Sequence, residues 1–196
     1  MSKRMFPITC EQQGVYFDCI IDPENLRYNN PKIISFPVSF APEDVAEAVC
    51  SVLECHPVLF SHFEDRDGSP MQVYADECKA VVEVLNVGDD DIETVKQNFI
   101  RVFDISCGPL YRAQVLAAPS CVSLLLDFHH LVYDGASLNI LMNEICAAIE
   151  GTYPSAEPHS YRDFSDAQHA DKTDHKAYFD KMLGGGVTST SLPSDL

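Results

Sequence analysis

Apolar and polar positions alternate along the chain with two periods, and each period predicts a different kind of element. A period of two over residues 32–40 is typical of a strand with one buried face. Apolar runs of strand length cover residues 111–117 and 122–128, and the short connection between them predicts an antiparallel hairpin. Further expectations are a polar turn over residues 63–68 and strands over residues 71–74 and 81–87.

Apolar residues at spacings of three and four predict helices between these strands. Thr9 and Gln12 have the spacing of a capping box, which predicts a short helix through about Phe17. Another helix begins at Pro42, because proline suits a first helical turn, and ends before Pro57. The predicted buried faces comprise Val45, Val49, Val52 and Leu53; Ile92, Val95, Phe99 and Val102; and Leu138, Leu141, Met142, Ile145 and Ile149.

The succession of strands and helices predicts the α/β class, with a mixed, largely antiparallel sheet packed against helices. A charged helix or helix pair is expected over residues 161–183. Three glycines then lead into a Ser/Thr-rich end that has the composition of a linker. We therefore divide the chain into a lobe over residues 1–183 and a linker-like tail over residues 184–196.

Composition narrows the choice of partners and of location. The 196 residues include 13 Lys and Arg against 30 Asp and Glu, a formal net charge of -17, which repels nucleic acid. Apolar residues make up 46% of the chain, enough for a packed core. Because the sequence has neither a long apolar run nor the pattern of a signal peptide, we expect a cytoplasmic protein that does not enter membranes.

The eight cysteines are expected to be reduced and mostly buried, because the chain is long for a disulfide scaffold and most of them lie in apolar runs. The nearest approach to a metal cluster is Cys50, Cys55, His56 and His62, whose spacing fits none of the usual zinc patterns. We therefore expect no metal site.

The residues best suited to catalysis lie together in the segment 124–137. An apolar run ends at His129 and His130, and Asp134 and Gly135 form a turn before the next helix. A histidine at the end of a buried strand can stay neutral near pH 7 and serve as a general base. Strand alternation places the two rings on opposite faces, so only one of them can serve such a site. From spacing alone a catalytic site and a hydrogen-bonded turn both remain open, with Asp134 or Ser137 as the helix N-cap.

The segment from His129 to Ser137 resembles the His-His-x-x-x-Asp-Gly motif of nonribosomal peptide synthetase condensation domains, which belong to the superfamily of chloramphenicol acetyltransferase-like acyltransferases. Further segments resemble other motifs of that family, in the same order along the chain. These segments are Thr9 to Tyr16, His56 to Leu59 with Phe63, Phe103 to Ile105 with Gly108 to Arg112, and Tyr161 to Phe164.

The resemblance implies a domain of two lobes with the active site in a tunnel between them, of which this chain corresponds to the N-terminal lobe. It implies that His130 acts on an acceptor amine, as general base or by positioning the amine for attack on a thioester. His129 and Asp134 would be structural, and Gly135 would leave space for a phosphopantetheine arm. Tyr133 and Ser137 are candidates for the tunnel wall.

Two departures from the family pattern concern the arginine that is expected to hold Asp134. Cys55 begins the segment Cys-His-Pro-Val-Leu-Phe, where the family more usually has Arg-His-Glu-x-Leu-Arg. Gly14 stands where the first motif commonly has arginine. Arg112 is therefore the first candidate for the partner of Asp134, with Arg101 and Arg162 behind it.

The function that the resemblance implies is that of an acyltransferase, which forms amide bonds between acyl and aminoacyl groups. No cofactor would be tightly bound, because the substrates are presented on the phosphopantetheine arms of donor and acceptor carrier proteins. The other partner would be the second lobe, without which we expect little turnover. The alternatives are a non-catalytic lobe that binds a carrier or another partner, and a stand-alone acyltransferase that uses coenzyme A and assembles its site between subunits.

Overall fold

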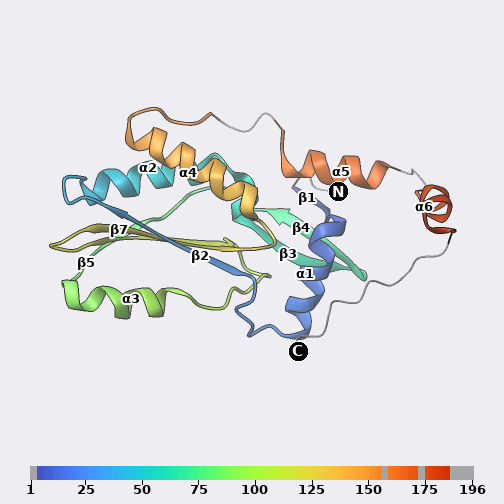
Figure 1. The fold of residues 1–196 in the computed structure, drawn as a ribbon, viewed down its shortest axis with the longest axis horizontal. Coiled ribbons are helices and arrows are strands. Elements are labelled where there is room, and N and C mark those ends of the chain that lie inside the picture. Colours follow the sequence, from blue (N-terminus) through green and yellow to red (C-terminus); the bar gives the residue numbers. More distant parts are fainter. Residues whose placement is uncertain (1–3, 156–158, 172–174, 186–196) are drawn as a thin grey trace.

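The computed structural model describes residues 4–155, 159–171 and 175–185, and its main feature is a four-stranded mixed sheet (Figure 1). Its strand order is β2-β7-β6-β5, with β5 parallel to β6 and the other neighbours antiparallel. This arrangement confirms the predicted α/β class and the predicted hairpin of β6 and β7. The strands are β2 (Asn29–Phe36), β5 (Glu83–Asn86), β6 (Tyr111–Ala117) and β7 (Val122–His129).

Strand β7 is buried along its whole length because helices cover both faces of the sheet. Helices α2 (Pro42–Glu54) and α4 (Gly135–Ile149) lie on one face, and α3 (Ile92–Phe99) lies on the other (Figure 1). Burial of this apolar surface is the main force that holds the layers together. The predicted stripe of α2 is confirmed, since its members Val45, Val49, Val52 and Leu53 are all fully buried.

A second, smaller sheet has the order β1-β4-β3 and is antiparallel throughout. Its strands are β1 (Met5–Pro7), β3 (Ser61–Arg66) and β4 (Ser69–Tyr74). Helix α1 (Cys10–Ile21) follows β1, and the 3-10 helix η1 (Pro57–Phe60) leads into β3. The pair expected near the C-terminus is α5 (Tyr161–Ala170) and α6 (Lys176–Leu183).

The positions at which the structure differs from the sequence-based expectations have local causes. Residues 61–66 form a strand rather than a turn, because Asp67 and Gly68 have positive φ angles of 56° and 82° and close a tight hairpin between β3 and β4. Helix α1 continues to Ile21 rather than to Phe17, since its last apolar residues are exposed and left no buried stripe in the sequence pattern. Strand β2 ends at Phe36, before Pro37.

Two further corrections concern the predicted helix of residues 92–102 and the cysteines. Helix α3 ends at Phe99, so Val102 lies outside it, and the carbonyl oxygen of Val102 accepts a hydrogen bond from Arg112. All eight cysteines carry free thiols, but the expectation that most are buried is wrong. Only Cys19 is buried, whereas Cys10, Cys107 and Cys146 are exposed.

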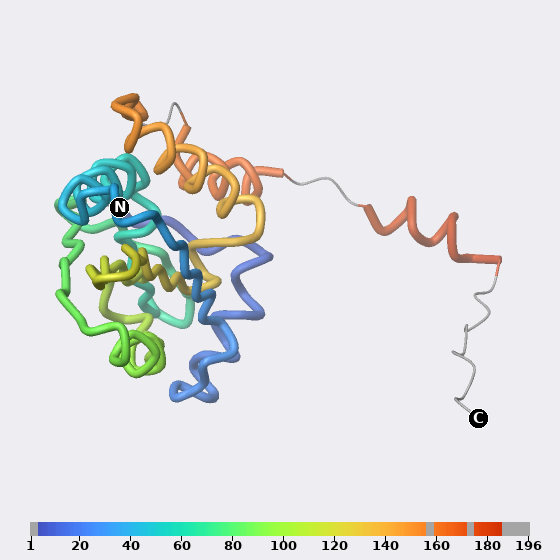
Figure 2. The backbone as a smooth tube through the Cα atoms, turned by 60° about the vertical axis from the view of Figure 1, so that its left-hand side comes forward, coloured from blue at the N-terminus to red at the C-terminus, as the bar shows by residue number. Residues whose placement is uncertain are grey.

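Helix α6 stands apart from the packed layers (Figure 2). Four of its apolar side chains are therefore exposed, namely Tyr178, Phe179, Met182 and Leu183. Most of the predicted linker-like tail, residues 186–196, lies outside the described residues. Within the described ranges no helix is both long enough and apolar enough to cross a membrane.

Candidate functional site

The two histidines at the end of β7 lie in opposite environments. His129 is the last residue of the strand and only 4% exposed, whereas His130 is exposed. Their backbone N–H groups donate to different neighbours, His129 to the oxygen of Leu110 at 3.0 Å and His130 to that of Tyr28 at 2.9 Å. The chain is thus held on both sides at the point where the strand ends. The two rings were predicted to lie on opposite faces, and the difference in exposure between His129 and His130 agrees with this prediction.

The ring of His129 is fully engaged inside the protein. Its Nδ1 accepts a hydrogen bond from the backbone N–H of Leu131 at 3.2 Å, so the proton of the neutral ring lies on Nε2, 3.6 Å from Sγ of Cys19. Burial lowers the pKa of His129 to about 4, and the charges of His130 and Arg112 act in the same direction. His129 is therefore neutral at pH 7 and has no nitrogen left for a substrate.

The ring of His130 has the opposite arrangement. Its Nδ1 lies 2.7 Å from the carbonyl oxygen of Tyr133. Because a carbonyl oxygen only accepts, Nδ1 carries the proton and the lone pair of the neutral ring lies on Nε2. Within residues 4–155, 159–171 and 175–185, Nε2 of His130 has no hydrogen-bond partner. This nitrogen is available to accept a proton from a bound group.

His130 lines a hollow of about 670 Å³ that several separate segments enclose. The predicted site residues His130, Tyr133, Asp134 and Ser137 all lie in its wall, so the structure brings these four together. His129 does not line it, and instead faces a separate hollow of about 490 Å³ beside Cys19. The remaining wall is formed by Glu11, Gln12, Val15, Val58, Leu131, Val132, His159, Ser160, Tyr161 and Phe164.

Asp134 is the N-cap of α4, one of the roles that the sequence left open. Its Oδ1 accepts hydrogen bonds from the backbone N–H and the hydroxyl of Ser137, at 2.8 and 2.7 Å. The backbone hydrogen bond from Ser137 is the main reason that the pKa of Asp134 is lowered. The carboxylate therefore fixes the point at which the turn after the histidines becomes a helix.

Arg112 pairs with Asp127 and not with Asp134, so this expectation is corrected. The register of β6 and β7 places Arg112 opposite Asp127, and Nη1 lies 3.0 Å from Oδ2 of that fully buried carboxylate. The guanidinium also donates to the carbonyl oxygens of Arg101 and Val102 and lies 3.6 Å above the ring of Phe103. Phe103 in turn contacts His129 edge-on, so Arg112 supports the end of β7 from the face of the sheet that α3 covers.

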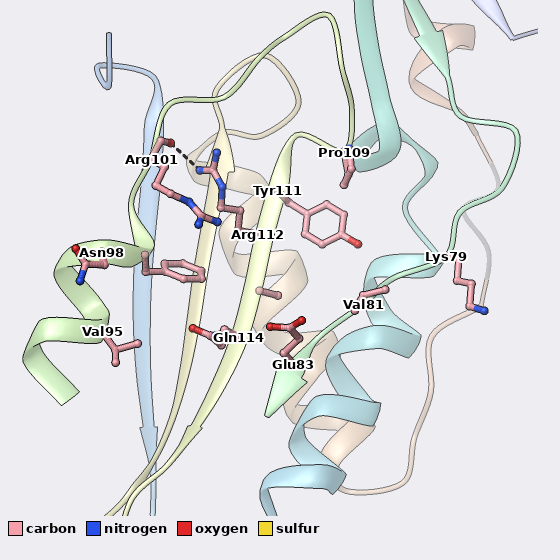
Figure 3. Close-up of a pocket in the computed structure, with 12 residues that line it drawn as sticks. Lys79, Val81, Glu83, Val95, Asn98, Arg101, Pro109, Tyr111, Arg112 and Gln114 are labelled. Carbon is pink, nitrogen blue, oxygen red and sulfur yellow. Dashed lines mark hydrogen bonds between the residues drawn. The ribbon is translucent and has the colours of Figure 1, made fainter. Parts of the chain in front are cut away.

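Arg112 and Arg101 lie on the wall of a third hollow, of about 580 Å³, between α3 and strands β5 and β6 (Figure 3). Figure 3 shows the hydrogen bond that joins Arg112 to the backbone of Arg101. This hollow is on the opposite side of the sheet from α4. The predicted supporting residue Arg112 therefore does not share a cavity with His130.

Sequence reasoning missed the part that Gln12 plays in the site. Its side-chain oxygen accepts from the backbone N–H of Thr9 at 3.0 Å, which confirms the capping box. Its side-chain nitrogen reaches across the fold and donates to the carbonyl oxygen of Leu131 at 2.8 Å and to Gln72 at 2.9 Å. Gln12 thus ties the start of α1 to the turn after the histidines. The capping pattern identified the residue, but nothing in the sequence indicated this distant partner.

Gly135 begins α4 beside the hollow. A Cβ atom added at Gly135 would meet no heavy atom within 4 Å. The described residues therefore leave free space next to this glycine.

Residues 2–196 match the family described as "Condensation domain". The chain is 25% identical over 197 residues to surfactin synthase subunit 2 of Bacillus subtilis (strain 168). This alignment covers 97% of this chain and 6% of that protein. It is 30% identical over 199 residues to bacitracin synthase 3 of Bacillus licheniformis. This alignment covers 98% of this chain and 3% of that protein.

Among solved structures, the condensation domain from the monacolin K polyketide synthase MokA has a similar fold, with a TM-score of 0.80 at 19% identity. That match covers 96% of this chain and 45% of the solved chain. The protein therefore belongs to the condensation-domain family and has the chloramphenicol acetyltransferase-like fold of one lobe. It spans about half of that solved chain and less than a tenth of the two synthases.

Proposed function

We propose that this chain is the N-terminal lobe of a condensation domain that forms amide bonds between carrier-bound thioesters in a nonribosomal peptide synthetase. The observation that carries the proposal is the proton placement on His130. The His130 ring lines a hollow of about 670 Å³, its Nδ1 donates to the carbonyl oxygen of Tyr133, and its Nε2 has no partner within the described part of the chain. Membership of the condensation-domain family supports the same conclusion.

In the proposed reaction the amine of the acceptor attacks the carbonyl carbon of the donor thioester. The new C–N bond forms as the C–S bond breaks, and the amine must lose a proton during this exchange. Nε2 of His130 accepts that proton or holds the N–H bond in the direction of attack. The hydrogen bond from Nδ1 to the carbonyl oxygen of Tyr133 persists in both protonation states, so the ring keeps its orientation throughout.

The proposed partners are a second lobe and two carrier proteins. Each carrier presents its substrate on a phosphopantetheine arm, and the free space beside Gly135 leaves room for such an arm. A second lobe would form the opposite wall of the hollow at His130. Without that wall the substrates lose positioning contacts, so we expect the 196-residue chain alone to give little or no amide product.

The test uses the full-length protein with loaded donor and acceptor carriers, in single-turnover reactions. We expect His130→Ala to lower the rate of amide formation by about 10²- to 10⁴-fold, the usual contribution of general acid–base catalysis. His175→Ala is the matched control, because this histidine is exposed at the start of α6 and lines none of the hollows described above. The control should retain a rate within about threefold of wild type.

A wild-type rate in His130→Ala would contradict the proposal. Carrier binding that persists without amide formation in the wild-type protein would instead favour the non-catalytic binding lobe. Transfer from coenzyme A thioesters without any carrier protein would favour the stand-alone acyltransferase.

A further inference from the structure

A buried polar residue of the smaller sheet connects that sheet to the turn after the histidines. Gln72 lies on the central strand β4, opposite Phe6 of β1 and Phe63 of β3, and all three side chains are fully buried. Gln72 lines none of the hollows described above. Any effect of Gln72 on a bound substrate must therefore act through another residue.

The hydrogen bonds of Gln72 fix the orientation of its amide group. The side-chain oxygen accepts from Nε2 of Gln12 at 2.9 Å, and Nε2 of Gln72 donates to Oγ of Ser61 at 2.8 Å. All three side chains are buried, and a buried polar network whose members satisfy one another is rigid. Gln72 therefore presents its oxygen, and not its nitrogen, to Gln12.

Gln12 uses both hydrogens of its side-chain amide. Its oxygen accepts from the backbone N–H of Thr9, and a backbone N–H group can only donate, so the nitrogen of Gln12 lies on the other side. One hydrogen is directed at Gln72 and the other at the carbonyl oxygen of Leu131, 2.8 Å away. The acceptor on Gln72 thus supports the orientation in which Gln12 binds Leu131.

Leu131 follows His130 in the chain, and both of its backbone polar groups are bound. Its N–H group donates to Nδ1 of His129, and its carbonyl oxygen accepts from Gln12. Two residues further on, the carbonyl oxygen of Tyr133 binds Nδ1 of His130. A shift of Leu131 would therefore move His130 relative to the carbonyl group that orients its ring.

We propose that Gln72 is a positioning residue for His130. Gln72 fixes Gln12, Gln12 fixes the carbonyl group of Leu131, and the turn then holds the His130 ring in the wall of the hollow. The inference rests on the proposed function, because that function assigns His130 to the acceptor amine. It gives the smaller sheet a part in the reaction, although the wall of the hollow contains no residue of β1, β3 or β4.

The first experiment compares Gln72→Met with the wild type in single-turnover reactions of the full-length protein with loaded carriers. Methionine is similar in length to glutamine but offers Gln12 no oxygen acceptor. At saturating acceptor carrier we expect the rate of amide formation to fall about 10- to 100-fold, the size of effect that a shift of about 1 Å in a catalytic group produces. The half-saturating concentration of acceptor carrier should change by less than about twofold, because Gln72 does not touch the substrate.

Ser123→Ala is the matched control for the loss of a buried polar group. Ser123 is buried on β7, near the end of the strand that is remote from His129. This variant should react within about twofold of the wild-type rate. Thermal unfolding of each variant sets the temperature below which it is folded, and the rates are compared there.

A milder variant, Ser61→Ala, keeps the test open if Gln72→Met does not fold. It leaves Gln72 in place and removes only the acceptor for Nε2 of that residue. We expect a smaller loss of rate, about threefold, because Gln72 keeps its bond to Gln12 but is less firmly held.

The second experiment tests whether Gln72 acts through Gln12. Gln12→Met should lower the rate at least as much as Gln72→Met, and the double variant should react within about twofold of Gln12→Met alone, whereas independent effects would multiply. The ¹⁵N chemical shift of Nδ1 in His130 gives a readout that a loss of stability alone would not move. It should change in Gln72→Met, because the bond to Tyr133 is disturbed, and stay unchanged in Ser123→Ala.

The inference is overturned if folded Gln72→Met and Ser61→Ala react at the wild-type rate, or if the losses of Gln72→Met and Gln12→Met multiply. An unchanged Nδ1 signal in Gln72→Met also overturns it. Failure of the proposed function has a different result, since His130→Ala would then retain the wild-type rate. If His130→Ala is inactive and Gln72→Met is fully active, only the positioning role is wrong.

Discussion

The inner and outer sides of the end of β7 differ in what they leave unpaired. On the inner side His129 is buried and both ring nitrogens have partners, with Phe103 and Arg112 layered beyond it. On the outer side His130 is exposed, and its Nε2 has no hydrogen-bond partner among the residues that the structure describes. Two identical residues, adjacent in sequence, thus have protons on opposite ring nitrogens. The backbone sets this difference, because Leu131 offers an N–H group to one ring and Tyr133 offers a carbonyl to the other.

The largest expected effect comes from breaking the support on the inner side. Arg112→Ala removes the cation beside Asp127, which is fully buried and keeps Oδ1 without a hydrogen-bond partner within the described ranges. Burial already raises the pKa of Asp127, against the hydrogen bond of Asn29 and the charge of Arg112. We expect the free energy of unfolding, measured with urea, to fall by about 3–5 kcal/mol, as when one partner of a buried ion pair is lost.

The neighbouring Arg101 provides the control for this change. It is exposed, and its backbone oxygen rather than its side chain binds Arg112. Arg101→Ala should therefore change the free energy of unfolding by less than about 0.5 kcal/mol. Similar losses in the two variants would contradict the proposed support of β7 by Arg112.

The second prediction concerns acid and the ring of His129. The pKa of His129 is lowered from 6.5 to about 4 in the folded protein, so between these values the unfolded chain binds a proton that the folded protein does not. The stability from this group is present above pH 6.5 and is lost as the pH falls toward 4. The loss should be on the order of 3 kcal/mol, measured by urea unfolding across this range.

His129→Asn tests the source of that pH dependence. The amide oxygen of asparagine can accept the hydrogen bond from Leu131 in place of Nδ1, but the side chain does not titrate. The variant should lose most of the slope between pH 4 and 6.5. A slope equal to that of the wild type would assign the acid sensitivity to other groups.

The third prediction concerns the outer side, where Asp134 caps α4. Asp134→Ala removes the acceptor for the backbone N–H of Ser137, and should lower the free energy of unfolding by about 1 kcal/mol. Asp134→Asn retains an N-cap oxygen and should cost less than about half of that amount. Equal losses would show that Asp134 contributes through its charge rather than through the cap.

The smallest expected effect on stability is that of Gly135→Ala. The added Cβ would meet open space at the start of α4, so the melting temperature should change by no more than about 2 °C. Amide formation in the full-length protein should nevertheless fall, because the methyl group would enter the space proposed for the phosphopantetheine arm. A wild-type rate would remove that role from Gly135.

Much of the fold follows from local patterns in the sequence. The capping box of Thr9 and Gln12, the buried stripe of α2 and the hairpin of β6 and β7 depend on short-range spacing, and all three were predicted. The polar residues of β3 form no apolar run and therefore indicate a turn, although the Asp67-Gly68 pair is a strong hairpin signal.

The site was predicted less completely, because its support comes from pairing across the fold. The prediction that Arg112 pairs with Asp134 was wrong, although the predicted hairpin contains the true partner, Asp127. The four-residue connection between β6 and β7 places Arg112 opposite Asp127. The contacts of Gln12 with Leu131 and of Tyr28 with His130 join segments more than 100 residues apart. The spacing of residues along the chain does not predict contacts between such distant segments.

The most direct test of this account is the protonation of the two ring nitrogens in each histidine, read from ¹⁵N chemical shifts of labelled imidazoles at pH 7.5. We expect the proton of the neutral ring to lie on Nδ1 in His130 and on Nε2 in His129. A His130 protonated on Nε2 would contradict it, because that ring would then present a donor, and not a base, to the acceptor amine.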